Sequence, residues 1–165
     1  MRLLQSNLRT LIVVHCAATL FMVGLIWTIH YVHYPLFANV GESTYVSFQE
    51  AHVERIGKVL FIPWVTEGAT LVGILTVAFL GGHKTLRVAA ITNGAAMAVV
   101  LVISGFWSAP AHGKLAKGFD QSVHQQLMTA NLIRSLAWSV CGICAIWLLL
   151  ATWANSRPDQ PALDI

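Results

Sequence analysis

The sequence predicts an all-α protein: a bundle of four transmembrane helices with short interfacial helices in two of its connections. Two observations support this prediction. Of the 165 residues, 56% are hydrophobic and only 10% are charged, whereas a soluble domain carries about 25% charged residues. Four apolar segments are also long enough to cross a bilayer, which takes about 20 helical residues. Helices are favoured because a lipid-exposed strand or loop would leave backbone polar groups unpaired.

The expected spans follow one another closely along the chain, at about residues 11–37, 59–80, 88–109 and 132–154. Together they form one integral membrane domain over residues 1–165, with a loose, proline-containing tail at 155–165. The first span is too long for the apolar region of a signal peptide, and no small-residue cleavage site follows it. We therefore expect the first span to be retained.

The connections define two ends of the bundle. Side A holds the N-terminus, the 81–87 turn and the tail, and side B holds the longer connections 38–58 and 110–131. Each side carries five Lys and Arg residues if Arg134 is assigned to side B. Arg134 falls inside the fourth span, which leaves side B with fewer basic residues in its connections than side A has. The positive-inside rule therefore favours side A as the cytoplasmic side. The expectation is a bacterial inner-membrane protein with both termini in the cytoplasm.

The histidines are concentrated at side B. Five of the seven lie at or near it, namely His30, His33, His52, His112 and His124. The other two, His15 and His83, fall toward side A. His30 and His33 are three residues apart, a spacing that places two side chains in one sector of an α-helix.

Helical spacing continues into both side B connections. Tyr45, Phe48 and His52 recur at intervals of three or four residues, which predicts an interfacial helix that runs into the second span. In the other connection, Asp120 is a plausible N-cap for a helix that carries His124 and Asn131 on one face. These helices direct the side B histidines toward the bundle.

Glu67 is the lone carboxylate within the second span. It lies about 12 Å into that span at 1.5 Å per helical residue. An ionised carboxylate at this depth costs at least ~2.5 kcal/mol, so such residues face the bundle interior, pair or become neutral. Arg134, near the side B end of the fourth span, is its expected partner by depth.

These residues predict a polar pocket in the side B half of the bundle, because titratable groups held in a low-dielectric cavity tend to mark functional sites. The candidate catalytic residues are His30, His112, Glu67 and Arg134. The candidate substrate-binding residues are Trp27, His33, His52, Arg55, His124 and Asn131.

The order of these motifs resembles the anthrone-oxygenase-like family of small four-span membrane proteins. The resemblance rests on GLIWTIHYVHYPLF, a His-x-x-Arg helix, the intramembrane Glu, and the segment from Pro110 to Trp138. It extends over nearly the whole chain, and the last segment is its most specific part. The resemblance implies an oxygenase that acts on polycyclic aromatic anthrones without a conventional cofactor, with Asn131, Arg134 and the histidines lining the substrate site.

The residues themselves leave several functions open. A base and Arg134 can remove a proton and hold the resulting anion for reaction with O2. The cofactor is unknown: there is none, or the side B histidines hold haem or a transition metal. A small proton-coupled transporter and a membrane assembly or structural protein are the remaining alternatives. The expected partners are the lipid bilayer, a hydrophobic small molecule and a second copy of the chain, and the scattered basic residues exclude nucleic acid.

Two further patterns have packing as their simplest explanation. Small residues recur every fourth position, at Ala90, Gly94 and Ala98 and again from Ala137 through Cys141 to Ala145. Such stripes allow helices to approach closely within one chain or between copies. Cys141 and Cys144 form a CxxC motif, but a reactive thiolate is disfavoured in lipid.

Overall fold

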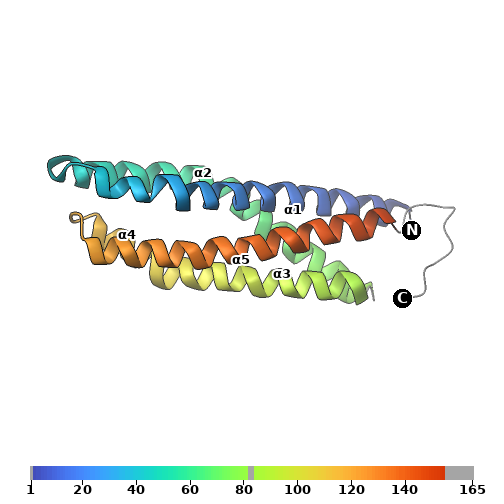
Figure 1. Cartoon of the computed structure of the whole chain (residues 1–165). Helices are drawn as coiled ribbons and strands as arrows, with labels where there is room; N and C mark the ends of the chain where they lie inside the picture. Colours follow the sequence, from blue (N-terminus) through green and yellow to red (C-terminus); the bar gives the residue numbers. More distant parts are fainter. Residues whose placement is uncertain (1, 82–83, 155–165) are drawn as a thin grey trace.

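The computed structural model describes residues 2–81 and 84–154, and within these ranges the chain is helical with no strand. Four long α-helices, α1, α2, α3 and α5, form the bundle (Figure 1). Shorter elements join them at side B. In chain order the elements are α1 (Arg2–Thr28), the π-helix η1 (Ile29–His33), the 3-10 helix η2 (Pro35–Asn39), α2 (Glu42–Leu80), α3 (Lys84–Ile103), the π-helix η3 (Ser104–Ser108), α4 (Ala109–Leu115) and α5 (Gln121–Ala154).

Four helical runs are long and apolar enough to cross a membrane, which confirms the predicted fold class. They are Asn7–Asn39, Glu42–Leu80, Leu86–Leu115 and Gln121–Ala154. Each run extends beyond the predicted span at side B, and in the second and fourth runs the extension is the predicted interfacial helix. The third run continues through Pro110 because this proline lies in the first turn of α4, where a missing N–H costs no hydrogen bond.

Each long helix packs against particular neighbours in the bundle. α1 contacts both α2 and α5, and α3 contacts α5 most extensively. Figure 1 shows α2 beginning beside α1 and ending near α3. Pro63 lies within this helix. The start of α1 and the end of α5 lie at the same end of the bundle (Figure 1). Ala90, Cys141 and Ala145 are fully buried, so these members of the small-residue stripes serve packing within the chain.

An apolar, outward-facing band marks the part of the bundle that fits the bilayer. On α2 the exposed charged residues end at Lys58, and the exposed large side chains from Val59 to Leu80 are apolar. On α5 the corresponding band runs from Leu132 to Trp153. Each stretch of 22 residues spans about 33 Å, close to the ~30 Å hydrocarbon core. We call this the lipid band; the side B ends of α2 and α5 extend beyond it.

The two predicted interfacial helices are the parts of α2 and α5 that lie beyond the lipid band. Residues 42–58 are continuous with the second span, as expected. The second begins as predicted at Asp120, whose Oδ1 accepts a hydrogen bond from the backbone N–H of Val123 at 2.9 Å. This bond satisfies one of the free N–H groups of the first helical turn.

Candidate functional site

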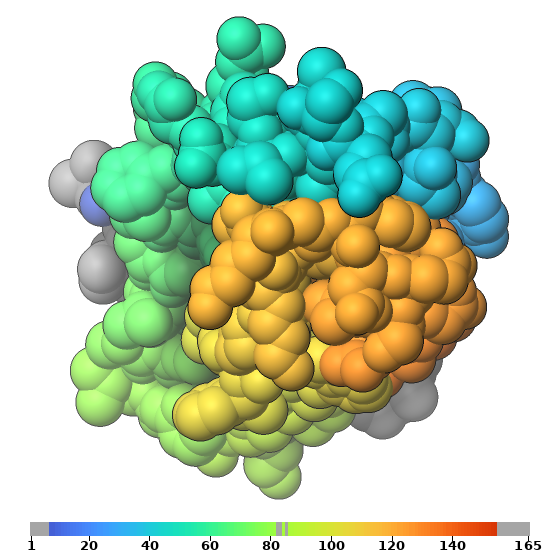
Figure 2. All heavy atoms as spheres, turned by 90° about the vertical axis from the view of Figure 1, so that its left-hand side faces the viewer, coloured from blue at the N-terminus to red at the C-terminus, as the bar shows by residue number. Residues whose placement is uncertain are grey.

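Four of the five side B histidines gather where the extended helix ends meet. His33, from η1, lies against His52 of α2, and their ring centroids are 4.8 Å apart. His52 in turn lies 5.2 Å from His112 of α4. Phe37 packs against His124 of α5 at 6.2 Å. Figure 2 views this end of the molecule and shows the start of α2 packed over the corner between α4 and α5.

We call this group the cap cluster, since it closes the side B end of the bundle. Its members are His33, Tyr34, Gln49, His52, His112, His124 and Arg134. His52 precedes Val59 by seven residues and His124 precedes Leu132 by eight, which places both about 10–12 Å outside the lipid band. The cluster therefore lies at the level of the lipid headgroups.

Direct side-chain hydrogen bonds connect the cap cluster. His33 Nε2 and His52 Nδ1 are 2.8 Å apart. Because one of these nitrogens must accept the proton that the other donates, the two histidines cannot both be imidazolium at these atoms. His112 bonds on both sides, with Gln49 Nε2 at 2.8 Å from Nδ1 and the Tyr34 hydroxyl at 2.9 Å from Nε2.

Backbone contacts fix the same residues in place. His124 Nε2 donates to the carbonyl oxygen of Tyr34 at 2.8 Å. Tyr34 is 3% exposed and His124 is 5% exposed, so this bond is shielded from water. A shielded bond of this kind orients η1 against α5 and holds the Tyr34 hydroxyl toward His112.

Arg134 reaches the cap cluster from within the bundle. It is 5% exposed, and its guanidinium lies close to the Tyr34 hydroxyl and close enough to His112 for their charges to interact. The ring of Trp138 lies 5.4 Å from the guanidinium carbon, a cation–π contact. Within residues 2–81 and 84–154 no carboxylate forms an ion pair with Arg134, and its Nε has no hydrogen-bond partner.

The predicted pairing of Arg134 with Glu67 is wrong. Glu67 Oε2 instead accepts a hydrogen bond from Trp138 Nε1 at 3.0 Å. Trp138 thus stands between the two charged residues, with its N–H on the carboxyl group and its ring beside the guanidinium. Trp138 is fully buried.

Glu67 belongs to a second polar group at the middle of the lipid band. We call this group the core centre: His15 and Thr19 of α1, Glu67 and Thr70 of α2, and Asn93 of α3. His15 Nδ1 lies 3.0 Å from Thr70 Oγ1, and Asn93 Nδ2 lies 3.0 Å from His15 Nε2. His15, which we expected to belong to side A, therefore lies inside the bundle.

The core centre contains polar atoms without partners. The Thr19 hydroxyl lies close to the carboxyl of Glu67, but neither Thr19 Oγ1 nor Glu67 Oε1 has a partner with hydrogen-bond geometry among the described residues. Asn93 Oδ1 also has no hydrogen-bond partner among the described residues. An unpaired polar atom away from water costs free energy, so these atoms are available to a bound water or a proton.

His30 and Arg55 do not join the cap cluster. The ring contacts of His30 are with Trp27 at 5.8 Å and Tyr31 at 5.0 Å, and Arg55 is exposed on the outer face of α2. The shared sector predicted for His30 and His33 assumed an α-helix. Both residues instead lie in the π-helix η1, whose wider turn changes the angle between them.

Trp27 and Asn131 form their side-chain hydrogen bonds outside the cap cluster. Trp27 Nε1 donates to Ser139 Oγ at 3.0 Å. Asn131 is fully buried, and its Nδ2 donates to the backbone carbonyl of Ile26 at 3.5 Å. Both bonds join α1 to α5, so the geometry supports a structural role for these two candidate substrate-binding residues.

Sequence reasoning missed Tyr34 and Gln49. Gln49 is fully buried in a part of α2 whose outer face is exposed and charged, and it precedes the buried His52 by three residues. That spacing places Gln49 and His52 on one helix face, so the position of His52 could have indicated Gln49 as a member of the site. Tyr34 directly precedes Pro35, where η2 begins, and nothing in the sequence marked the register change of η1.

The predicted histidine ligands do not form a metal-binding group. Across the part of the chain that the structure describes, no three His, Cys, Asp or Glu side chains are arranged to hold a metal ion. His33 and His52 bond to each other, and His112 is occupied on both nitrogens. In this arrangement the bonded ring nitrogens of these three histidines are directed at other side chains.

The fold and the two polar groups define a class: an integral membrane four-helix bundle with a histidine-rich cap. No family model, curated protein or solved structure matches the chain. The function is therefore inferred from the geometry of the side chains.

Proposed function

We propose that this protein is a membrane oxidoreductase of the oxygenase type, which acts on a hydrophobic aromatic molecule with a weakly acidic C–H or O–H group. The observation that carries the proposal is the buried Arg134, which has no carboxylate partner in the described residues and lies beside the hydrogen-bonded pair of Tyr34 and His112.

The guanidinium of Arg134 is in an environment suited to an anion. A buried charge is costly unless it is paired and hydrogen-bonded. Arginine presents several N–H donors in a fixed plane, which suits an enolate or phenolate oxygen. The neutral Tyr34 hydroxyl adds one more donor beside it. Together these groups stabilise the negative charge that forms on a substrate oxygen after loss of a proton.

His112 is the base in this proposal. Gln49 and Tyr34 occupy both of its ring nitrogens, so the substrate proton reaches His112 through Tyr34. The Tyr34 hydroxyl passes its own proton to His112 Nε2 as it takes the proton of the substrate, and Nδ1–H then donates to Gln49 Oε1, which is unpaired among the described residues, once that amide has turned. A substrate oxygen placed between Arg134 and Tyr34 brings the acidic hydrogen toward His112. His112 therefore replaces His30, the alternative base that the sequence suggested.

The reaction is balanced with O2 as the oxidant. A ring methylene loses two hydrogens and gains a doubly bonded oxygen, and the second oxygen atom of O2 leaves as water. The first proton goes to His112, and the anion held by Arg134 and Tyr34 supplies electrons to O2. O2 and an aromatic substrate both enter from the membrane, whose surface is level with the cap cluster.

Glu67 takes the role of a positioning residue. Its bond to Trp138 Nε1 fixes the indole ring that lies beside the guanidinium of Arg134. The protein resides in the bacterial inner membrane in this proposal, with both termini in the cytoplasm and the cap cluster on the opposite face.

Anthrone is a suitable probe of the proposed reaction. Purified protein in detergent is expected to convert anthrone to anthraquinone under ¹⁸O2 with one labelled oxygen in the product, faster than the heat-inactivated protein does. The His112→Asn variant should lose about 100-fold or more of this rate, as an enzyme does without its general base. The matched control is His30→Asn, which removes a histidine outside the cap cluster and should keep the rate. Conversion no faster than the inactivated sample, or equal losses in both variants, would refute the proposal.

A proton pathway is the second candidate, and the core centre favours it. His15, Thr70 and Asn93 form a hydrogen-bonded chain, and Glu67 lies next to Thr70 through the bond of Thr70 Oγ1 to the Glu67 carbonyl at 3.0 Å. Intramembrane carboxylates with histidine neighbours relay protons in pumps and transporters. Protein in sealed vesicles with an internal pH dye tests this: a proton flux that Glu67→Gln abolishes supports transport, and a flux equal to empty vesicles excludes it.

A further inference from the structure

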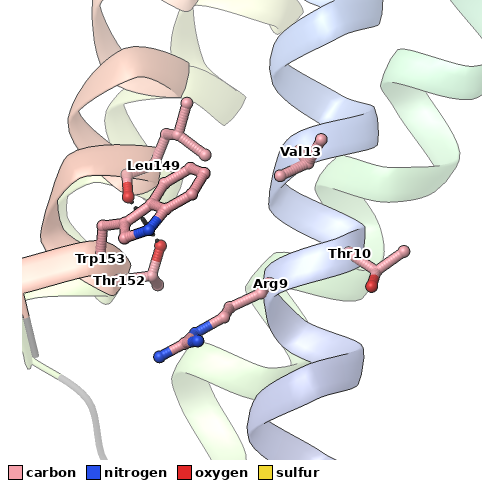
Figure 3. Close-up of a pocket in the computed structure, with 6 residues that line it drawn as sticks. All are labelled: Arg9, Thr10, Val13, Leu149, Thr152 and Trp153. Carbon is pink, nitrogen blue, oxygen red and sulfur yellow. Dashed lines mark hydrogen bonds between the residues drawn. The ribbon is translucent and has the colours of Figure 1, made fainter. Parts of the chain in front are cut away.

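At side A, away from both polar groups, the surface has a groove between α1 and α5. Its volume is about 270 Å³, and it is lined by Arg9, Thr10, Val13, Leu149, Thr152 and Trp153. Figure 3 shows the side chains of Arg9 and Trp153 extending from opposite helices into the space between them. The groove joins helices from the two ends of the chain, beside the point where α5 ends at Ala154.

The groove lies at the edge of the lipid band. Trp153, 60% exposed, is the last large apolar residue on the outer face of α5, and Val13, 45% exposed, is among the first on α1. Arg9 precedes Val13 by four residues, about 6 Å farther toward side A. The apolar floor of the groove is therefore level with acyl chains, and its charged mouth is level with phosphate groups.

Arg9 supplies a positive charge that no described residue neutralises. The described residues contain one ion pair, between Lys58 and Glu54 at the other end of the molecule. The hydroxyl of Thr152 donates to the backbone carbonyl of Leu149 at 2.9 Å. Arg9 is the one charged residue among those that line the groove. Arginine binds phosphate oxygens with two parallel N–H bonds, and tryptophan favours the interface between hydrocarbon and headgroups.

We propose that this groove binds one anionic phospholipid. Its phosphate lies on Arg9, the indole of Trp153 packs at the glycerol level, and an acyl chain lies along Val13 and Leu149. This site is independent of the cap cluster, and its test does not depend on the proposed oxidoreductase activity.

Native mass spectrometry of the full-length protein tests the proposal, with release from nanodiscs of equal parts phosphatidylglycerol and phosphatidylcholine. We expect one retained phosphatidylglycerol per chain. Arg9→Gln should lower its retention about fivefold, the effect of losing one basic residue at an anionic surface. The matched control is Arg55→Gln, an exposed arginine at the other end of the bundle. Arg55 lies about 38 Å from the side A end of α2, measured along the helix axis. Because this distance is well beyond the ~8 Å screening length, removing its charge should leave lipid retention unchanged.

A second variant tests the groove itself. Val13→Trp fills the apolar floor without changing charge and should also lower retention, while the helical circular dichroism of each variant shows that it folds. Equal retention of both lipids, or equal losses in Arg9→Gln and Arg55→Gln, would overturn the proposal. The alternative partners of Arg9 are the carboxylates of Asp159 and Asp164. In that case the wild type retains no phosphatidylglycerol and the double variant D159N/D164N does retain it, a result that also overturns the proposal.

Discussion

The cap cluster and the core centre contain similar residues in different surroundings. Both have an amide side chain and one charged residue, and the cap cluster has four histidines where the core centre has one; only the core centre lies in the middle of the lipid band. In the cap cluster, histidines bond to each other and to Tyr34. In the core centre, His15 is held on both nitrogens by Thr70 and Asn93. The cap cluster thus joins histidines to one another at the side B end of the bundle, whereas the core centre joins α1, α2 and α3 within the lipid band.

The largest effect is expected where the two layers meet, at Trp138. Trp138→Ala removes a fully buried indole that contacts both Glu67 and Arg134, and it should lower the free energy of unfolding by ~3–5 kcal/mol. Unfolding in mixed detergent micelles measures the change. Trp153→Ala, at an exposed tryptophan of the same helix, should change stability by about 0.5 kcal/mol or less. Equal effects in the two variants would mean that Trp138 does not link the layers.

A smaller effect is expected within the core centre. Asn93→Leu removes the bonds of Asn93 Nδ2 to His15 Nε2 and to the Cys141 carbonyl. Hydrogen bonds between membrane helices contribute roughly 0.6–1.7 kcal/mol each, so a loss of about 1–2 kcal/mol is expected, with turnover of anthrone retained per folded molecule. Asn7→Leu, at an exposed asparagine of α1, is the control. If Asn93→Leu abolished turnover but kept stability, the core centre would have a chemical role instead.

The smallest effect is the coupling between Glu67 and Trp138. Glu67→Leu, Trp138→Phe and the double variant form a cycle in which Glu67→Leu removes the acceptor, while Trp138→Phe keeps the ring beside Arg134 but removes the N–H. The coupling energy is expected near 0.6 kcal/mol, the average for such bonds in membranes. The corresponding cycle with Glu67→Leu and Arg134→Met should give a smaller value, since these residues make no direct contact. A larger coupling for Glu67 with Arg134 would restore the ion pair that the sequence suggested.

The sequence predicted the fold well because lipid imposes strict rules on it. Apolar length defined the four spans, and the side chain of Asp120 marked the start of α5. Helix ends beyond the lipid band were less predictable, since α2 continues through charged residues that resemble a loop in composition. The helical spacing of Tyr45, Phe48 and His52 was the better guide there.

The site was predicted in part. His33, His52, His112 and His124 were predicted to converge, and hydrogen bonds or ring contacts join each of them to another member of the cluster or to Phe37. His30 was assigned wrongly because no sequence signal marks the π-helix η1. The partner of Glu67 was assigned by depth alone, and depth cannot reveal that Trp138 occupies the intervening space. Which polar residues bond across helices depends on rotation about each helix axis.

Arg134 offers the most direct test of the account, because stability and activity should respond to it in opposite ways. If its charge serves a substrate anion, Arg134→Met removes a costly buried cation, and the free energy of unfolding should stay equal or rise, as it does when well-packed apolar residues replace buried charges. Turnover of anthrone by the same variant should fall about 100-fold or more. A loss of ~3–5 kcal/mol of stability, the cost of breaking a buried ion pair, with turnover retained would contradict the account.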